Sequence, residues 1–223
     1  MTMFVVFIGP AGSGKTSLVQ AYGDWIEENL YLRIARVNLD PGVSVLPYTP
    51  VFDIRTIYTL QDVMKTYRLG PNGAFIKAGE LIIEKLDEIM KHEPFRNVFE
   101  WDMILVDTPG QMEAFILRPS SNQFFERLSK YGNVIGVFVI DASAINNYVD
   151  ALVLWFLSIL TQVKLNIITI PVINKIDHAR NLLYAKTIIE NPEEALEIIK
   201  KQSIEGIISD IAPELAALAI KTI

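Results

Sequence analysis

Residues 9–16 read Gly-Pro-Ala-Gly-Ser-Gly-Lys-Thr and directly follow an apolar run at 4–8. This is the strand–GxxxxGK[ST] pattern of a phosphate-binding loop, and residues 15–29 after it have a helical pattern. Glycines permit a tight turn that points N–H groups at phosphate oxygens, and a helix N-terminus adds partial positive charge. The alternative is a glycine-rich turn without a ligand, but the complete spacing between strand and helix favours a nucleoside triphosphate site.

The phosphate loop predicts a role for individual side chains. We expect the Lys15 ammonium to reach the β- and γ-phosphates and the Thr16 hydroxyl to be a ligand of Mg²⁺. The residues expected to bind the phosphates are Gly12, Ser13, Gly14, Lys15, Thr16 and Ser17.

Strand-like and helix-like segments alternate along the 223 residues, which predicts one α/β domain over 1–223. The expected fold class is a three-layer P-loop NTPase fold with a mainly parallel sheet and right-handed crossovers. Apolar runs predict strands at 5–8, 34–39, 103–106, 134–140 and 167–173. Helical patterns lie at 15–29, 79–91, 112–128, 148–163 and 192–202, and loops are expected at 40–53 and 68–73.

The composition limits the partners. The formal net charge is −6, and no basic stripe is visible, so a nucleic-acid partner is not expected. The sequence has no cysteine and two histidines, which excludes disulfides and thiolate sites and fits a cytoplasmic location. The apolar run at 151–160 is too short to span a bilayer, so no membrane role is expected. A hydrophobic fraction of 51% suggests that a second subunit covers part of the surface.

A second polar motif, Asp-Thr-Pro-Gly-Gln at 107–111, follows the predicted strand 103–106. A carboxylate at the carboxyl end of a strand beside a phosphate loop can hold Mg²⁺ through water, which is the role expected of Asp107. The Gly110 N–H can bind a γ-phosphate, and Gln111 is placed to orient the attacking water. An ordinary Asp-Thr-Pro-Gly turn is the alternative.

A third motif, Asn-Lys-Ile-Asp at 174–177, follows the last predicted strand. The Asp177 carboxylate can accept hydrogen bonds from both N1–H and the exocyclic amine of guanine, a donor pair that adenine lacks. Asn174 and the Lys175 stem can orient and cover the base. The three motifs in this order, each after a strand, predict GTP and GDP as the ligands.

Two further turns complicate this interpretation. Asp40 precedes Pro-Gly after the second predicted strand, where its carboxylate could approach Mg²⁺ or the hydrolytic water, or could simply start a turn. Gly70-Pro71-Asn72 precedes a helical pattern, and by itself this tripeptide is a common turn.

Taken together, these motifs resemble those of the GPN-loop GTPases, with an archaeal-type member as the best description. The resemblance rests on GPAGSGKT at 9–16, NLDPG at 38–42, GPN at 70–72, DTPGQME at 107–113 and NKID at 174–177. It implies Mg²⁺-dependent GTP hydrolysis by a homodimer, with Asn72 of one subunit reaching the phosphates held by the other. It also implies a catalytic set of Asp40, Gln111, Asn72 and Lys15, and metal ligands Thr16, Asp40 and Asp107.

The sequence departs from the family pattern after residue 177. The expected base-backing Ser-Ala-Lys motif has only Ile-Lys-Thr at 220–222 as a candidate, and the final helix of such folds is missing. The resemblance further suggests a protein client, of the kind met in RNA polymerase assembly.

Three functional hypotheses follow. The leading one is a GTPase whose nucleotide state opens and closes a dimer. The second is a nucleotide-gated scaffold or assembly factor with slow turnover. The third is a related dimeric ATPase, which would carry a second lysine where this chain has Pro10.

Overall fold

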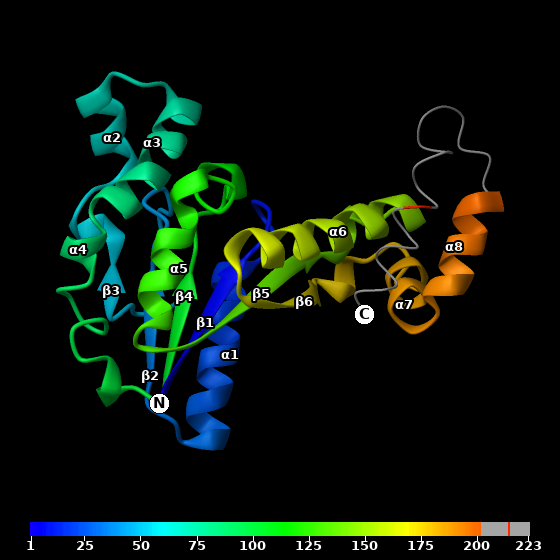
Figure 1. Cartoon of the computed structure of the whole chain (residues 1–223), viewed down its shortest axis with the longest axis horizontal. Helices are drawn as coiled ribbons and strands as arrows, with labels where there is room; N and C mark the ends of the chain where they lie inside the picture. The colour runs from blue at the N-terminus through cyan, green and yellow to red at the C-terminus, as the bar shows by residue number, and fades with distance from the viewer. Residues whose placement is uncertain (202–213, 215–223) are drawn as a thin grey trace. The chain divides into compact units, whose positions relative to one another are not determined.

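The computed structural model describes residues 1–201 and residue 214. The chain divides into two compact units (Figure 1). The first unit comprises residues 1–139 and 161–170, and the second comprises residues 140–160 and those from 171 onward. A single domain over 1–223 stays a prediction, and each unit is described here by itself.

The strands form a sheet of six, in the order β3-β2-β4-β1-β5-β6. Their bounds are β1 (Thr2–Ile8), β2 (Ile34–Asn38), β3 (Phe52–Asp53), β4 (Met103–Asp107), β5 (Gly132–Asp141) and β6 (Ile168–Asn174). The pairs β1–β4, β1–β5, β2–β4 and β2–β3 are all parallel. Parallel strands separated by helices are the α/β architecture that the sequence predicted.

The helices are α1 (Lys15–Leu30), α2 (Leu60–Tyr67), α3 (Pro71–Glu84), α4 (Leu86–Ile89), α5 (Asn122–Ser129), α6 (Tyr148–Leu165), α7 (Leu183–Glu190) and α8 (Pro192–Lys201). The five predicted strands and the helices α1, α6 and α8 agree with the expectation to within a few residues. The elements that sequence reasoning missed are β3, α2 and α7, of which β3 ends the loop expected at 40–53.

The helix expected at 79–91 was misplaced. It starts at Pro71, with Gly70 as an extended N-cap, and breaks at Lys85 before the short α4. Proline is favoured in the first helical turn because its missing N–H has no partner there in any case. Asn72 therefore lies in the first turn of α3 and not in a loop before a helix.

The helix expected at 112–128 is also interrupted. Residues Met112–Ala114 and Pro119–Ser121 form short 3-10 turns, and the α-helix α5 begins only at Asn122. Proline disfavours helical backbone in the residue before it, and Arg118 is accordingly extended, with φ −72° and ψ 148°.

The core of the first unit lies between α1 and the sheet (Figure 1). Val19 and Ile26 of α1 pack against Val5 and Phe7 of β1 and Leu105 of β4. Alternate residues of a strand point to opposite faces, and the intervening Phe4, Val6 and Ile8 of β1 are also fully buried. Both faces of the sheet are therefore covered, which explains the almost continuous apolar character of its strands.

Helix α6 extends beyond the apolar run at 151–160, which alone was too short to span a bilayer. With 18 residues and a mean hydropathy of 1.4, it is long and apolar enough to cross a membrane by length and composition alone, a test that core helices of soluble proteins also pass. Trp155 is partly buried and lines a small apolar cavity of the second unit with Ile145, Ile173 and others. The exposed apolar residues of the helix are Val153, Leu160 and Val163.

Helix α3 approaches its neighbours very closely. A Cβ atom at Gly79 would lie 1.9 Å from the carbonyl oxygen of Ala114, so only glycine fits at this contact. One turn earlier, the ring of Phe75 lies 2.8 Å from the position of a Cβ on Gly42. The helix that carries Asn72 thus touches both the segment after β2 and the segment after β4.

The close contact at Gly79 predicts that Gly79→Ala destabilises the fold by about 1–3 kcal/mol, because the added methyl must push apart two backbones. A matched control is Gly73→Ala in the same helix, where the nearest atoms would be side-chain carbons at 3.4–3.8 Å. This control should be neutral or stabilising by up to about 1 kcal/mol, since alanine favours helix over glycine. Urea unfolding of both variants provides the comparison, and equal stabilities would contradict the packing argument.

Candidate functional site

The glycine-rich loop lies between β1 and α1, as predicted. Gly9, Gly12 and Gly14 have φ of 153°, 76° and 92°, which L side chains rarely adopt. At Gly9 a Cβ would also lie 2.5 Å from the Val139 carbonyl oxygen. Gly14 is the N-cap of α1 and has no side chain to satisfy the first N–H groups of the helix. These free donors at a helix N-terminus suit an anion.

Lys15 is almost completely buried, with 5% of its surface exposed. Its Nζ donates hydrogen bonds to the carbonyl oxygens of Gly9 at 2.9 Å and Pro10 at 3.0 Å. Burial lowers the pKa of this ammonium, while the charges of Asp107 and Asp40 act in the opposite direction. The lysine is therefore held at the loop, close to two carboxylates.

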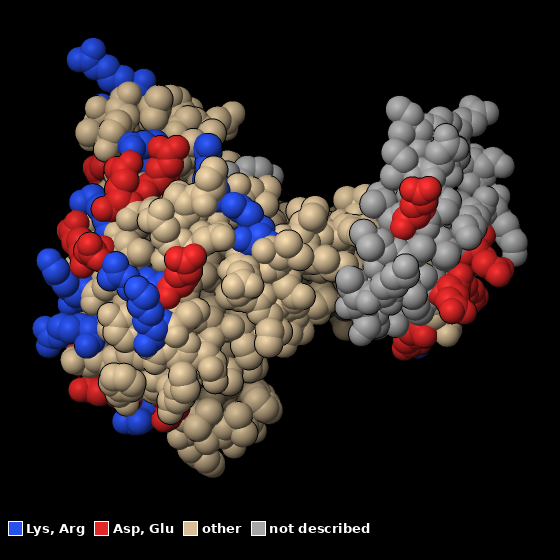
Figure 2. Space-filling model, viewed as in Figure 1, with Lys and Arg blue, Asp and Glu red and all other residues tan. Residues whose placement is uncertain are grey.

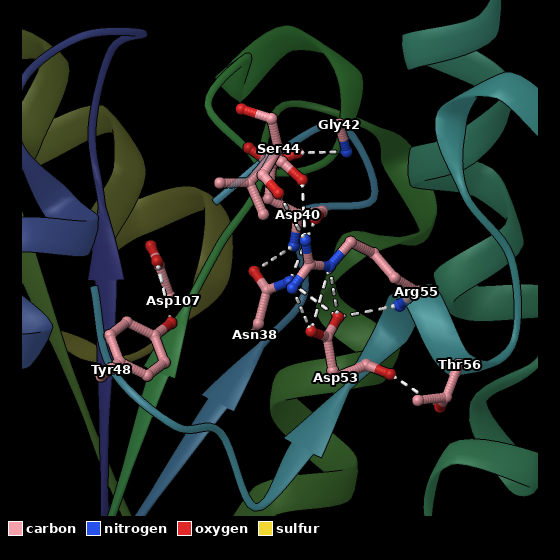
Figure 3. A network of polar contacts seen from close by, with 10 residues as sticks. Asn38, Asp40, Gly42, Ser44, Tyr48, Asp53, Arg55, Thr56 and Asp107 are labelled. Atoms are coloured by element: carbon pink, nitrogen blue, oxygen red, sulfur yellow. Dashed lines mark hydrogen bonds and ion pairs between the residues drawn. The ribbon is translucent and has the colours of Figure 1, made fainter. Parts of the chain in front are cut away.

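Asp107 ends β4 with 1% of its surface exposed. Burial raises the pKa of this carboxyl to about 6, although Thr16, Tyr48 and Lys15 each favour the charged form. The Tyr48 hydroxyl donates to Oδ2 at 3.1 Å (Figure 3). Thr16 approaches the same carboxylate, yet Oδ1 is buried and has no partner of good hydrogen-bond geometry.

Tyr48 is a site residue that sequence reasoning missed. It lies in the segment between β2 and β3, is 8% exposed, and its burial next to Asp107 raises the pKa of the phenol. An aromatic residue isolated between two prolines, Pro47 and Pro50, was the only signal in the sequence.

Asp40 connects the segment after β2 with the segment after β4. Its Oδ1 accepts the Gly42 N–H at 2.8 Å, and its Oδ2 accepts the Gly110 N–H at 3.1 Å. The donor that the sequence assigned to the γ-phosphate thus belongs to Asp40 in this structure. Gln111 follows directly, half-buried at the start of the 3-10 turn Met112–Ala114. The structure therefore brings Lys15, Thr16, Asp40, Asp107 and Gly110 together in the first unit.

The residues present fit a magnesium ion. A buried carboxylate whose pKa is raised and whose Oδ1 lacks a partner is stabilised by a nearby cation, and Thr16 adds a neutral oxygen. Magnesium takes oxygen ligands and is bound through one or two carboxylates together with phosphates and water. Over 1–201 no group of three or more His, Cys, Asp or Glu side chains capable of holding a metal was found. A magnesium–nucleotide site does not need one.

The Asn-Lys-Ile-Asp motif at 174–177, which was predicted to bind the base, belongs to the second unit. Asn174 ends β6, and Lys175 follows in the left-handed region with φ 57°. The Lys175 Nζ donates to Asp141 Oδ2 at 2.7 Å, so a strand-end carboxylate of β5 holds this lysine. Burial opposes the Asp141 charge, but hydrogen bonds from Lys175 and Ser143 outweigh it and lower the pKa of this carboxyl. The Asp177 side chain is 74% exposed, and its Oδ2 lies 3.3 Å from the Nε2 of His178.

Asp141 was not predicted, although a carboxylate directly after an apolar strand is the same signal that identified Asp107. Asn72, which was predicted, is exposed in the first turn of α3. Its side chain makes no hydrogen bond to any of the residues described. The Ile-Lys-Thr candidate at 220–222 lies outside the described residues.

Comparison with known proteins decides the family. The model of a family described as "conserved hypothetical ATP binding protein" matches residues 7–219. The chain is 38% identical to a GPN-loop GTPase of Pyrococcus abyssi over 175 residues, 78% of this chain and 68% of the relative. This chain belongs to the GPN-loop GTPase family.

Other comparisons support the assignment to the GPN-loop GTPases. The chain is 32% identical over 214 residues to GPN-loop GTPase 1 of Schizosaccharomyces pombe, covering 92% of this chain and 55% of the relative. A crystal structure of a GTPase in apo form from Pyrococcus abyssi superimposes with a TM-score of 0.72 at 31% identity. That match covers 99% of this chain and 83% of the crystallised chain. The chain therefore spans from about half to most of the length of these relatives.

The burial of Asp107 predicts that its ionised carboxylate destabilises the folded protein, although the same carboxylate is expected to hold Mg²⁺. In EDTA at pH 7.5, Asp107→Asn should stabilise the protein by roughly 1–3 kcal/mol, because a group with a raised folded pKa destabilises the fold once it is ionised. As the pH falls through 6, wild-type Asp107 binds its proton and the difference between the two proteins should shrink. Thermal unfolding between pH 5 and 8 provides the measurement, and a variant less stable than wild type at every pH would contradict this account.

Proposed function

We propose that this protein binds and hydrolyses GTP with Mg²⁺. The observation that carries the proposal is the gathering of Lys15, Thr16, Asp40 and Asp107 around a strand–loop–helix anion site, in a member of a family whose relatives are named GTPases. The family-model description mentions ATP, and the alternative of a related ATPase rests on it. Asp177 after β6 favours guanine and therefore GTP.

The site residues of the first unit each have a defined role in the proposed reaction. The loop N–H groups and the Lys15 ammonium bind the phosphates, and the Lys15 contacts to Gly9 and Pro10 would be exchanged for phosphate oxygens. Thr16, Asp107 and Asp40 would hold Mg²⁺, which would supply positive charge against the negative charge that develops on the transferred phosphate. Gln111 and Asp40 orient the attacking water, and the Gly110 N–H moves from Asp40 to the γ-phosphate.

Base recognition is assigned to the second unit. The Asp177 carboxylate is 74% exposed and could accept a pair of donors, and the Lys175 ammonium is held by Asp141. A site built to accept two donors discriminates strongly against a base without them, because its polar groups would otherwise stay unpaired.

The base preference predicts the effect of Asp177→Asn. An amide can no longer accept both guanine donors, so GTP binding should weaken by about 1–3 kcal/mol. Xanthosine triphosphate should bind better to the variant than to wild type, because its C2 oxygen accepts a hydrogen bond from the new amide. Calorimetric titration with both nucleotides tests this exchange. A variant that keeps the wild-type preference for GTP would refute the assignment.

We further propose a homodimer in which Asn72 acts on the phosphates of the neighbouring subunit. The support is that the Asn72 amide is exposed and without a hydrogen bond among the residues described, while α3 contacts the segments of Asp40 and Gly110 through Phe75 and Gly79. The exposed Val153, Leu160 and Val163 of α6 are candidates for surface covered by a second subunit. The nucleotide state would then control dimer conformation and the grip on a protein client.

The dimer proposal predicts that Asn72→Ala lowers turnover by about 10²–10³-fold with little change in GTP affinity, because a preorganised dipole is lost. Mixing Asn72→Ala with Lys15→Ala should restore one working site per mixed dimer, since each variant supplies what the other lacks. Co-purification of the untagged variant with an affinity-tagged copy of the other must first show that mixed dimers form. If they form and stay inactive, Asn72 does not act across the interface.

We also propose that nucleic acid is not a partner and that the protein is cytoplasmic. On the face of the first unit seen in Figure 2, basic and acidic side chains lie among one another, which does not favour a nucleic-acid partner. A cytoplasmic location fits the absence of cysteine.

A further inference from the structure

The segment that carries Asp40 is held by a network of polar contacts, and three of the side chains that build it were assigned no role by the motifs (Figure 3). The network joins the end of β2 (Asn38), the edge strand β3 (Asp53) and the turn after it (Arg55). Its centre is the Asp53 carboxylate, which accepts Asn38 Nδ2 at 2.9 Å and the Arg55 guanidinium through both oxygens. We call Asn38, Asp53 and Arg55 the brace.

Arg55 is the member of the brace that reaches the Asp40 segment. Its Nε lies 3.0 Å from each Asp53 oxygen, and its Nη2 donates to Oδ2 at 2.5 Å. The remaining nitrogen, Nη1, donates to the carbonyl oxygens of Val43 at 3.0 Å and Ser44 at 3.2 Å. A planar guanidinium can donate to a carboxylate along one edge and to two successive carbonyl oxygens from another nitrogen, which a lysine ammonium cannot do in this geometry.

The charges of the brace are stable at neutral pH. Partial burial opposes the Asp53 charge, but hydrogen bonds from Arg55 and Asn38 outweigh it and lower the pKa of Asp53. The Arg55 and Asp53 side chains are 26% and 14% exposed, so water screens this pair less than a surface pair. Asp53 and Arg55 are therefore both ionised at neutral pH, and the hydrogen bonds between them are retained.

Asn38 transmits the position of the brace to Asp40. This side chain is completely buried, its Oδ1 accepts the Asp40 N–H at 3.0 Å, and its Nδ2 donates to the Asp40 carbonyl at 3.2 Å. The backbone of Asp40 is thus held on one side by Asn38, and the chain three residues later is held by Arg55. Between these two anchors the Asp40 carboxylate accepts the N–H groups of both Gly42 and Gly110.

We propose that Arg55 is a positioning residue for GTP hydrolysis, which acts by fixing the 40–44 segment so that the Asp40 carboxylate meets Gly110 and the phosphate site. This inference deepens the proposed function and rests on it for the role of Asp40. Arg55 does not touch the phosphate loop through any contact seen in the described residues, so its effect must pass through the 40–44 segment.

A purely structural role and a positioning role predict different results. If Arg55 merely stabilises the fold, its loss lowers the unfolding temperature and adds to the effect of any other variant. If it acts through Asp40, its loss reduces kcat, leaves KM nearly unchanged and costs nothing further once Asp40 has been replaced. The double-variant comparison therefore separates the two roles.

The experiment uses Arg55→Met and Arg55→Lys, each alone and combined with Asp40→Asn, in the full chain. Arg55→Met should lower kcat about 10- to 100-fold, the range seen when a group that orients a ligand residue is removed. Arg55→Lys keeps the positive charge but loses the paired hydrogen bonds of the guanidinium, and its kcat should fall nearly as much. The matched control is Arg33→Met, which removes a comparable but exposed fork to Asp102.

Amide hydrogen exchange in a peptide covering 38–46 supplies a readout independent of turnover. Arg55→Met should exchange faster there than wild type, while Arg33→Met should not. Unchanged exchange would overturn the inference, as would kcat losses of Arg55→Met and Asp40→Asn that multiply in the double variant. A wild-type protein without GTP hydrolysis would refute the proposed function instead, and faster exchange in Arg55→Met would still show that the brace holds the segment.

Discussion

Two opposite charges are buried next to each other where β1 and β4 end, and the rest of the site depends on this pair. Lys15 and Asp107 are 5% and 1% exposed. Removing charges from water costs several kcal/mol per ion unless partners compensate for the loss. The Gly9 and Pro10 carbonyls accept hydrogen bonds from Lys15. The Tyr48 hydroxyl and the Thr16 side chain favour the charged form of Asp107. The compensation is incomplete, since Asp107 Oδ1 lacks a good partner, and this is the property expected of a site completed by a ligand.

The segments around this pair are connected to one another. Asp40 joins the segment after β2 to Gly110 after β4, and α3 packs against both segments through Phe75 and Gly79. A γ-phosphate that takes the Gly110 N–H must release it from Asp40, which changes two segments that α3 contacts directly. The GPN tripeptide lies at the start of this helix, and the proposed function therefore expects it to respond to the bound nucleotide.

The sequence predicted the parts of the molecule that depend on local chemistry. Glycine spacing, a carboxylate after an apolar strand and the apolar runs themselves all act over a few residues. The glycine-rich loop, the position of Asp107 and the strands β1, β2 and β4 were predicted from them. It missed α2, although Thr59 and Asp62 form a capping box that is visible as Thr-x-x-Asp. It could not reveal Tyr48, Asp53 or Arg55, because their roles arise from contacts that only the folded segment 40–53 creates.

Titration of GTP and ATP into the nucleotide-free protein, with Mg²⁺ and with EDTA, tests the central claim most directly. The account predicts that GTP binds more tightly than ATP, and that removing Mg²⁺ weakens GTP binding because the buried Asp107 carboxylate is then left near the phosphates without a cation. ATP binding as tight as GTP binding, or GTP binding that is unaffected by EDTA, would contradict it.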